Sequence, residues 1–112
     1  MRLTAATLLA ALAPSSAAAW PTPPAWWRAQ AACIRSHEGS WTTATGNGYE
    51  GAYQFKRSTW VAVGGSVDWR GHWASVATPA EQTYRAWLNW RANGNRWGGR
   101  QWPVAARLCG LA

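Results

Sequence analysis

The sequence predicts a small, mostly helical α+β domain with one short β-hairpin and one disulfide bond. Three observations carry this prediction. An apolar stripe of helical period starts near Ala25, a helix-capping motif stands at Thr78–Glu81, and a turn sequence, Gly46–Gly48, is flanked by threonine and aromatic residues. The 112 residues suffice for one domain with a modest core, and 11 of them are tryptophan.

The N-terminus has the features of an export signal. Arg2 is followed by an apolar run, Leu3–Ala13, and by the small residues Ala17–Ala19. We therefore expect residues 1–19 to be a signal peptide, the alternative being a disordered alanine-rich tail. The apolar run is too short to span a bilayer, so no transmembrane segment is expected.

Residues 20–24 are rich in proline and are expected to form an extended lead-in to a single domain at residues 25–112. Small exported domains usually need a covalent cross-link. Cys33 and Cys109 are the only cysteines, so we expect them to pair. Closing so long a loop would stabilise the fold by roughly 4 kcal/mol. Two free buried thiols are the alternative.

The first expected helix carries Trp27, Ala31, Ile34 and Glu38 on one face. Gly39 follows as a suitable C-terminal cap, so Glu38 should end the buried stripe on its core side.

Further helices are expected downstream. Ser58 should cap a short helix that reaches Val63, Thr78–Glu81 should begin the longest helix, and Gly94 should end it. Pro103 should open a last helical turn that carries Cys109. The predicted core face of the long helix comprises Ala80, Tyr84, Trp87, Leu88 and Arg91.

The hairpin is expected to pair the segment Trp41–Thr43 with Tyr49–Phe55 across the dipeptide Asn47-Gly48. A hairpin of this size is not stable alone and must pack against helices. Ser66–Val76 shows no clear period and is expected to be a loop or a short helix.

The net charge is +7, and the basic residues, nearly all arginine, are scattered along the chain. No compact basic run suggests nucleic-acid binding. A diffuse positive field favours an anionic polymer such as a cell wall or a phospholipid surface, although solubility alone would also account for it.

Three of the four acidic residues have simple structural roles. Glu81 is a capping residue, Asp68 a turn or solvated acid, and Glu50 a solvated acid at a strand end. Glu38 differs because it continues an apolar stripe, and buried unpaired carboxylates are rare without a reason. An ion pair with Arg28, Arg57 or Arg91 is the alternative.

Apolar surroundings raise the pKa of a carboxyl group and make it a proton donor near neutral pH. Tryptophan faces suit stacking on sugar rings, so glycan cleavage is the first hypothesis. His37 and His72 have no spacing with the cysteines that makes a zinc site. The chain also has no serine-hydrolase elbow and no phosphate or dinucleotide loop. No metal or cofactor is expected.

The chain from Trp26 to Gly110 resembles the resuscitation-promoting factor, or transglycosylase-like, domain of actinobacteria. The matching segments are Glu38–Trp41, Ala44–Tyr49, Gly51–Phe55, Ser58–Trp60, Trp97–Gly99 and Trp102–Val104. The resemblance implies a compact lysozyme-like fold that cleaves the β-1,4 bond between N-acetylmuramic acid and N-acetylglucosamine in peptidoglycan. It also implies that Glu38 is the acid/base and that a disulfide joins Cys33 to Cys109.

The expected substrate-binding residues are Trp41, Thr45, Tyr49 and Gln54, with Trp60 or Trp97 as further candidates near the cleft. The chain departs from the family's pattern in three places. Four residues separate Cys33 from Glu38, Ala52–Gln54 replaces the usual Gly-Leu-Gln, and Glu50 stands where an aromatic residue is usual. Glu50 is therefore a candidate second carboxylate.

The resulting expectation is a secreted or wall-associated monomer that acts on glycan strands as a single-glutamate lytic transglycosylase. A cell-wall peptidase is a candidate partner, and no nucleic acid is expected. One alternative is a two-carboxylate hydrolase that uses Glu50. Others are a non-catalytic glycan-binding module and a cationic surface that disturbs membranes.

Overall fold

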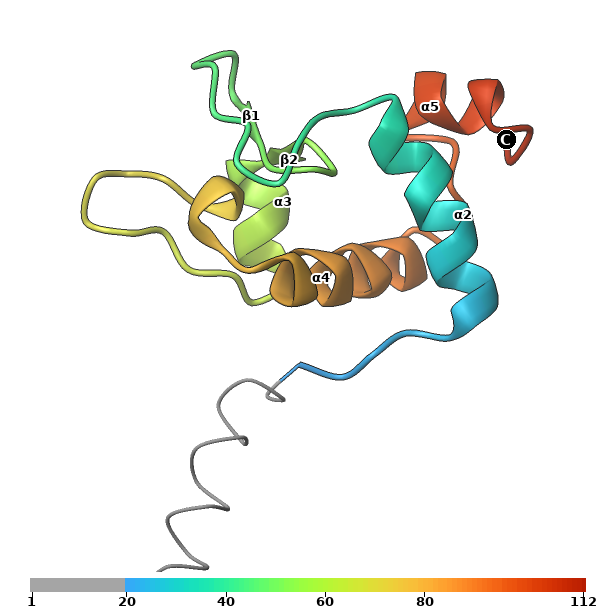
Figure 1. Cartoon of the computed structure of the whole chain (residues 1–112), viewed down its shortest axis with the longest axis horizontal. Helices are drawn as coiled ribbons and strands as arrows, with labels where there is room; N and C mark the ends of the chain where they lie inside the picture. The colour runs from blue at the N-terminus through green and yellow to red at the C-terminus, as the bar shows by residue number, and fades with distance from the viewer. Residues whose placement is uncertain (1–19) are drawn as a thin grey trace, which may run out of the picture.

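The computed structural model describes residues 20–112, so the expected signal peptide, residues 1–19, lies outside the described residues. Figure 1 shows the order of the elements, which are α2 (Ala25–Ser36), β1 (Tyr49–Glu50), β2 (Phe55–Lys56), α3 (Arg57–Ala62), the 3-10 helix η1 (Ala74–Val76), α4 (Pro79–Ala92) and α5 (Pro103–Leu108). The predicted fold class, mostly helical with one small hairpin and one disulfide, is confirmed. No helix within 20–112 is long and apolar enough to cross a membrane.

Helix α2 buries the predicted stripe, since Trp27, Ala31 and Ile34 are fully shielded from solvent. The helix ends at Ser36, two residues before Glu38, so the carboxylate belongs to the connection after the helix. Gly39 is not a left-handed cap as predicted. It allows close packing instead, because a Cβ atom there would lie 3.1 Å from the Gln54 side chain.

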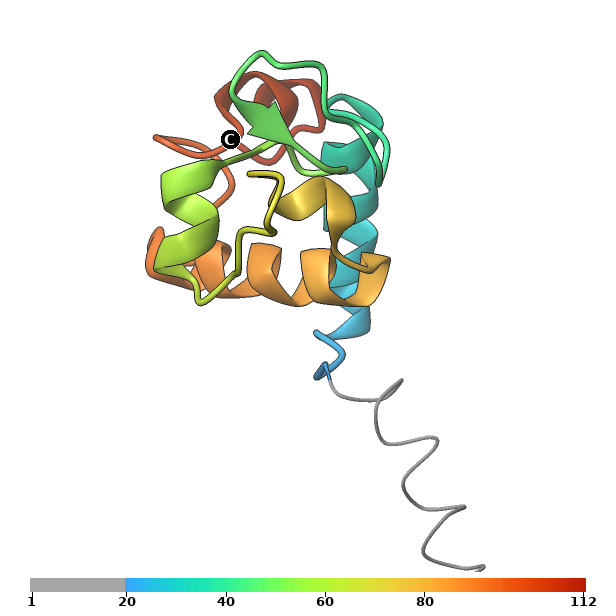
Figure 2. The ribbon, with the colours of Figure 1, turned by 90° about the vertical axis from the view of Figure 1, so that its left-hand side faces the viewer.

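The hairpin forms around a later turn of the chain than the Asn47-Gly48 turn that was predicted. Strands β1 and β2 pair antiparallel, with Glu50 opposite Phe55, and residues 51–54 make the turn between them. The Asn47-Gly48 turn instead leads to a single bridge between Ala44 and Glu50. Figure 2 shows this hairpin at one end of the molecule and α4 at the other.

Helix α4 begins as predicted, with the Thr78 hydroxyl accepting a hydrogen bond from the Glu81 amide. Its predicted core face is wrong, because the buried residues are Gln82, Arg85, Ala86, Asn89 and Trp90. Gln82 accounts for the error. Its side-chain oxygen accepts a hydrogen bond from the Ala52 amide, and its side-chain nitrogen donates to the carbonyls of Trp41 and Ala77. A polar side chain is therefore satisfied inside the core.

Helix α3 begins at Arg57 and has Lys56 as its N-cap, so Ser58 is not the cap that the sequence suggested. Helix α5 brings Cys109 back to the end of α2, where it forms the predicted disulfide with Cys33. Their Cα atoms are 6.0 Å apart.

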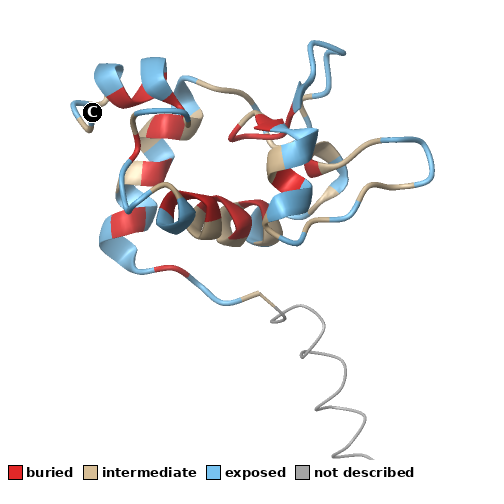
Figure 3. Ribbon diagram, turned by 180° about the vertical axis from the view of Figure 1, so that it is seen from behind, coloured by how far each residue is buried: buried red, intermediate tan, exposed pale blue. Residues whose placement is uncertain are grey.

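The core is largely aromatic. Trp27 stacks on Trp97 with ring centroids 5.1 Å apart, and Trp97 also contacts Trp102 at 5.2 Å. At the hairpin side, Phe55 packs edge-on against Trp60. Figure 3 shows the buried positions of the helices turned toward the centre of the molecule.

Candidate functional site

Glu38 lies on a pocket of about 670 Å³. Its lining comes from three parts of the chain. Glu38 extends from the connection after α2, the hairpin and α3 supply one group, and the segment before α5 supplies another. The remaining lining residues are Tyr49, Gln54, Lys56, Ser58, Thr59, Arg100, Gln101, Trp102 and Pro103. The pocket is therefore assembled by the tertiary fold.

The Glu38 carboxylate has no hydrogen-bond or ion-pair partner among residues 20–112. The ion pair considered with Arg28, Arg57 or Arg91 does not form. Glu38 is partly buried, and this burial raises the pKa of its carboxyl group. A carboxylic acid in this state keeps its proton at higher pH than an exposed one and can donate it to a bound ligand.

Two pocket residues have unusual backbone conformations. Gln54 has φ 51° and Trp102 has φ 52°, both in the left-handed region that side chains other than glycine rarely adopt. Hydrogen bonds hold them there. The Gln54 side chain donates to the Gly51 carbonyl at 3.0 Å, and the Trp102 indole donates to the Tyr53 carbonyl at 2.8 Å. Such strained residues often occur at functional sites.

The structure brings Tyr49 and Gln54 into the pocket of Glu38, and Tyr49 is 45% exposed there. Trp41 lies elsewhere, on a pocket of about 490 Å³ between the lead-in, α2 and α4. The guanidinium of Arg35 stands 4.8 Å over its ring. Thr45 is exposed and does not line the Glu38 pocket.

The tryptophan at the cleft was not the one the sequence suggested. Trp60 and Trp97 are buried in the core, at 1% and 2% exposure, and neither lines the Glu38 pocket. Trp102 lines it instead. Its place in the segment Trp102–Val104, which matches the family pattern, was a usable sign. Among the other lining residues, Ser58, Thr59 and Pro103 also stand in segments that match the family pattern, whereas Lys56, Arg100 and Gln101 stand in none.

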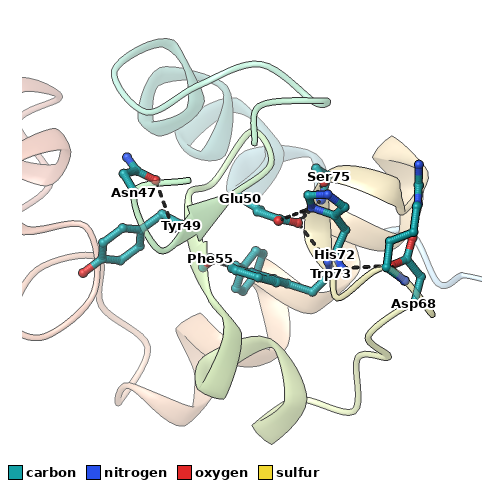
Figure 4. Close-up of polar contacts among 9 residues, drawn as sticks. Asn47, Tyr49, Glu50, Phe55, Asp68, His72, Trp73 and Ser75 are labelled. Carbon is teal, nitrogen blue, oxygen red and sulfur yellow. Dashed lines mark hydrogen bonds and ion pairs between the residues drawn. The ribbon is translucent and has the colours of Figure 1, made fainter. Parts of the chain in front are cut away.

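Glu50 is not the solvated acid that its place at a strand end suggested, since it is only 4% exposed. Figure 4 shows its carboxylate facing residues 72–75, which lead into η1 and form its start. There it contacts His72 Nδ1 at 2.7 Å and accepts hydrogen bonds from the Trp73 amide and the Ser75 hydroxyl, each at 2.8 Å. Burial alone would raise its pKa, but these hydrogen bonds outweigh burial and lower it. Glu50 does not line the Glu38 pocket.

The other two acids are held by contacts within the fold, although the Glu81 carboxylate pairs with an arginine instead of capping α4 as predicted. Asp68 accepts hydrogen bonds from the amides of His72 and Arg70 and pairs with the Arg70 guanidinium, which together lower its pKa. Glu81 pairs with Arg85 one helical turn later at 2.7 Å. Cys33, His37 and Cys109 place potential metal ligands within 4.8 Å of one another. The two sulfur atoms are bonded to each other, so this group does not offer a metal site in the oxidised protein.

Residues 22–105 match the family described as the transglycosylase-like domain. The chain belongs to this family. The resemblance seen in the sequence is thereby confirmed. The matched region contains Glu38 and all the other residues that line its pocket.

Three curated relatives are resuscitation-promoting factors. The chain is 36% identical to Rpf1 of Corynebacterium glutamicum, over 89% of this chain and 46% of the relative. It is 35% identical to Rpf of Micrococcus luteus, over 99% and 43%. It is 37% identical to RpfE of Mycobacterium tuberculosis, over 86% and 51%. The chain thus spans about half the length of these relatives. No solved structure gives a significant match.

Proposed function

We propose that the domain cleaves the β-1,4 bond between N-acetylmuramic acid and N-acetylglucosamine in peptidoglycan, with Glu38 as its only acid/base. One observation carries this proposal. The Glu38 carboxyl group borders the pocket, is partly buried and has no partner among residues 20–112. Its burial raises its pKa. Membership of the transglycosylase-like family supports the glycan substrate.

In the first step, the protonated Glu38 donates its proton to the bridging oxygen while the bond from that oxygen to the muramyl C1 breaks. The departing N-acetylglucosamine leaves with a neutral hydroxyl group. Positive charge develops on the muramyl ring, and the newly formed Glu38 carboxylate lies beside it.

In the second step, the C6 hydroxyl of the same muramyl residue attacks C1, and the Glu38 carboxylate accepts the hydroxyl proton. The product is a 1,6-anhydro muramyl end, no water is consumed, and Glu38 returns to its protonated state. This route needs only one carboxyl group, which is what the pocket provides.

The rest of the pocket suits a polar, partly anionic glycan. Tyr49 offers an exposed ring for a sugar face, and Gln54 and Gln101 offer amide groups for sugar hydroxyl and acetamido groups. Lys56 and Arg100 are cations suited to the carboxylates of muramyl residues and their peptides. These roles are proposals. Trp41 and Thr45 do not line this pocket.

The two-carboxylate hydrolase is less well supported. Retaining and inverting glycosidases hold two carboxyl groups about 5 to 9.5 Å apart across the bond. Glu38 is the only acidic residue among those that line the pocket. The Glu50 carboxylate is hydrogen-bonded to His72 and Trp73, on the other face of strand β1. A non-catalytic glycan-binding module would have no use for an unpaired acid with a raised pKa. Because the substrate lies outside the cell membrane, we also propose a wall location, with residues 1–19 as the export signal.

Mass spectrometry of the muropeptides released from purified peptidoglycan tests the mechanism. We expect products that end in 1,6-anhydro muramic acid, each lighter by one water than the corresponding hydrolysis product. Products with reducing muramic acid ends would show that water is the nucleophile and would contradict the single-carboxylate mechanism.

A further inference from the structure

The loop of residues 67–72, between α3 and η1, presents a tryptophan almost fully to solvent. Trp69 is 92% exposed, more than any other large apolar side chain in the described part of the chain. In Figure 1 this segment extends away from the helices, at the left of the view. The indole contributes nothing to the core, so folding does not account for its presence there.

The loop is held in place by hydrogen bonds. The Asp68 amide donates to the His72 carbonyl at 2.7 Å, and the Gly71 amide donates to the Asp68 carbonyl at 2.9 Å. The Asp68 carboxylate also accepts from the amides of Arg70 and His72. His72 in turn contacts the buried Glu50, as Figure 4 shows. A side chain presented on such an ordered loop loses little conformational entropy when it binds a partner.

We propose that this loop is a second glycan-binding site, at which Trp69 stacks on a sugar ring of a peptidoglycan strand. The inference rests on the proposed wall substrate. A sugar ring offers a flat apolar face surrounded by hydroxyl groups, and the loop has the complementary arrangement. The indole provides the flat face, and Asp68, Arg70 and His72, its neighbours in the loop, are partly exposed polar residues. The Arg70 guanidinium lies 5.8 Å from the indole centre.

The same residues fit a membrane poorly. Interfacial binding of a protein segment depends on several apolar side chains that enter the lipid together. Around Trp69 the loop offers a carboxylate, a guanidinium and an imidazole instead.

The loop and the Glu38 pocket lie on opposite sides of strand β1. Neighbouring strand residues point to opposite faces. Tyr49 lines the pocket, whereas Glu50 faces the loop, and Figure 4 shows the two side chains pointing apart. Trp69 therefore cannot contact the sugar that Glu38 acts on. The loop would retain the enzyme on the polymer without taking part in bond cleavage.

Sedimentation with insoluble peptidoglycan tests the site. The measurements use the E38Q variant as the parent, so that the polymer stays intact. We expect W69L to bind about three- to tenfold more weakly, which corresponds to the loss of one aromatic contact. W69F should bind nearly as tightly as the parent, because it keeps a flat ring. Equal affinity of W69L and the parent, or equal losses in W69L and W69F, would overturn the proposal.

Two controls test whether the loss of binding is specific to this loop and to a glycan. W26L makes the same replacement at a tryptophan that is 55% exposed on α2, and its affinity should be unchanged. An equal loss in W26L would show that tryptophan content alone determines binding. With Glu38 intact, W69L should cleave short soluble glycan fragments at the normal rate, whatever chemistry those products reveal. Binding of the parent to phosphatidylglycerol vesicles, lost in W69L, would assign the loop to a membrane instead.

Discussion

Glu38 and Glu50 have the same side chain, and the fold shifts their pKa values in opposite directions. Glu38 is partly buried without a partner, so burial favours its neutral form. Glu50 is more deeply buried but accepts hydrogen bonds from three residues, which favour its charged form. The first can supply a proton, whereas the second holds two segments of the chain together.

The raised pKa of Glu38 predicts a pH-dependent effect of Glu38→Gln on stability. The pKa of Glu38 is higher in the folded than in the unfolded state. Above that folded pKa the ionised carboxylate therefore lowers the stability of the fold. Glutamine does not ionise, so the variant should melt at a higher temperature than the parent at pH 7. The difference should vanish below about pH 4, near the ordinary glutamate pKa. Thermal melts across this range check it, and a variant less stable at pH 7 would contradict the assigned environment.

The sequence allowed Glu38 to be singled out because it follows an apolar helical stripe and belongs to a motif shared with the family. Its exact place was predicted less well, since the helix ends at Ser36. The burial of Glu50 could not be predicted. Its partners, His72, Trp73 and Ser75, follow it by more than twenty residues in a segment without a recognisable period.

At the scale of elements, the helices were predictable where apolar residues face the core and uncertain where polar residues do. The stripe of α2 was correct because its buried residues are apolar. The face of α4 was wrong because Gln82, Arg85 and Asn89 point inward. Gln82 is satisfied by backbone groups 5 to 41 residues away, and such long-range pairing leaves no periodic pattern in the sequence.

The Glu50 cluster joins strand β1 to the segment before η1, so Glu50→Gln should loosen both elements. Losing the charged acceptor should destabilise the protein by about 2 kcal/mol at pH 7. Because the folded pKa of Glu50 is lowered, the loss should shrink as the pH falls through that pKa. Urea denaturation checks it.

Glu81→Gln is the comparison variant, because it removes a carboxylate that pairs with Arg85 on α4 and takes no part in the Glu50 cluster. Below its melting temperature, Glu50→Gln should still cleave peptidoglycan. A folded Glu50→Gln protein without cleavage activity would instead identify Glu50 as a second catalytic carboxylate.

At the scale of the whole molecule, the Glu38 pocket depends on the ends of the domain meeting. Glu38 follows α2, and Trp102 precedes α5. The bond between Cys33, in α2, and Cys109, at the end of α5, joins these two helices. The disulfide was predictable because the chain has only two cysteines. The pocket was not, because residues 100–103 approach Glu38 only after the chain has folded.

Reduction of the disulfide should therefore lower both stability and activity. The loop it closes predicts a loss of roughly 4 kcal/mol, enough to lower the melting temperature of a domain this small by more than about 10 °C. Calorimetry with and without reductant, alongside a C33S/C109S variant, checks this. Unchanged melting in both would contradict a stabilising role of the bond.

The central claim is that one carboxyl group, that of Glu38, performs the proton transfers. The most direct test is the rate at which purified Glu38→Gln protein releases soluble muropeptides from peptidoglycan, compared with the parent protein. The variant keeps the shape of the side chain but has no transferable proton. We expect the rate to fall about 10²-fold or more, on the order of 3 kcal/mol of barrier, while the fold and polymer binding are retained. A Glu38→Gln protein that releases muropeptides at the parent rate would contradict the account.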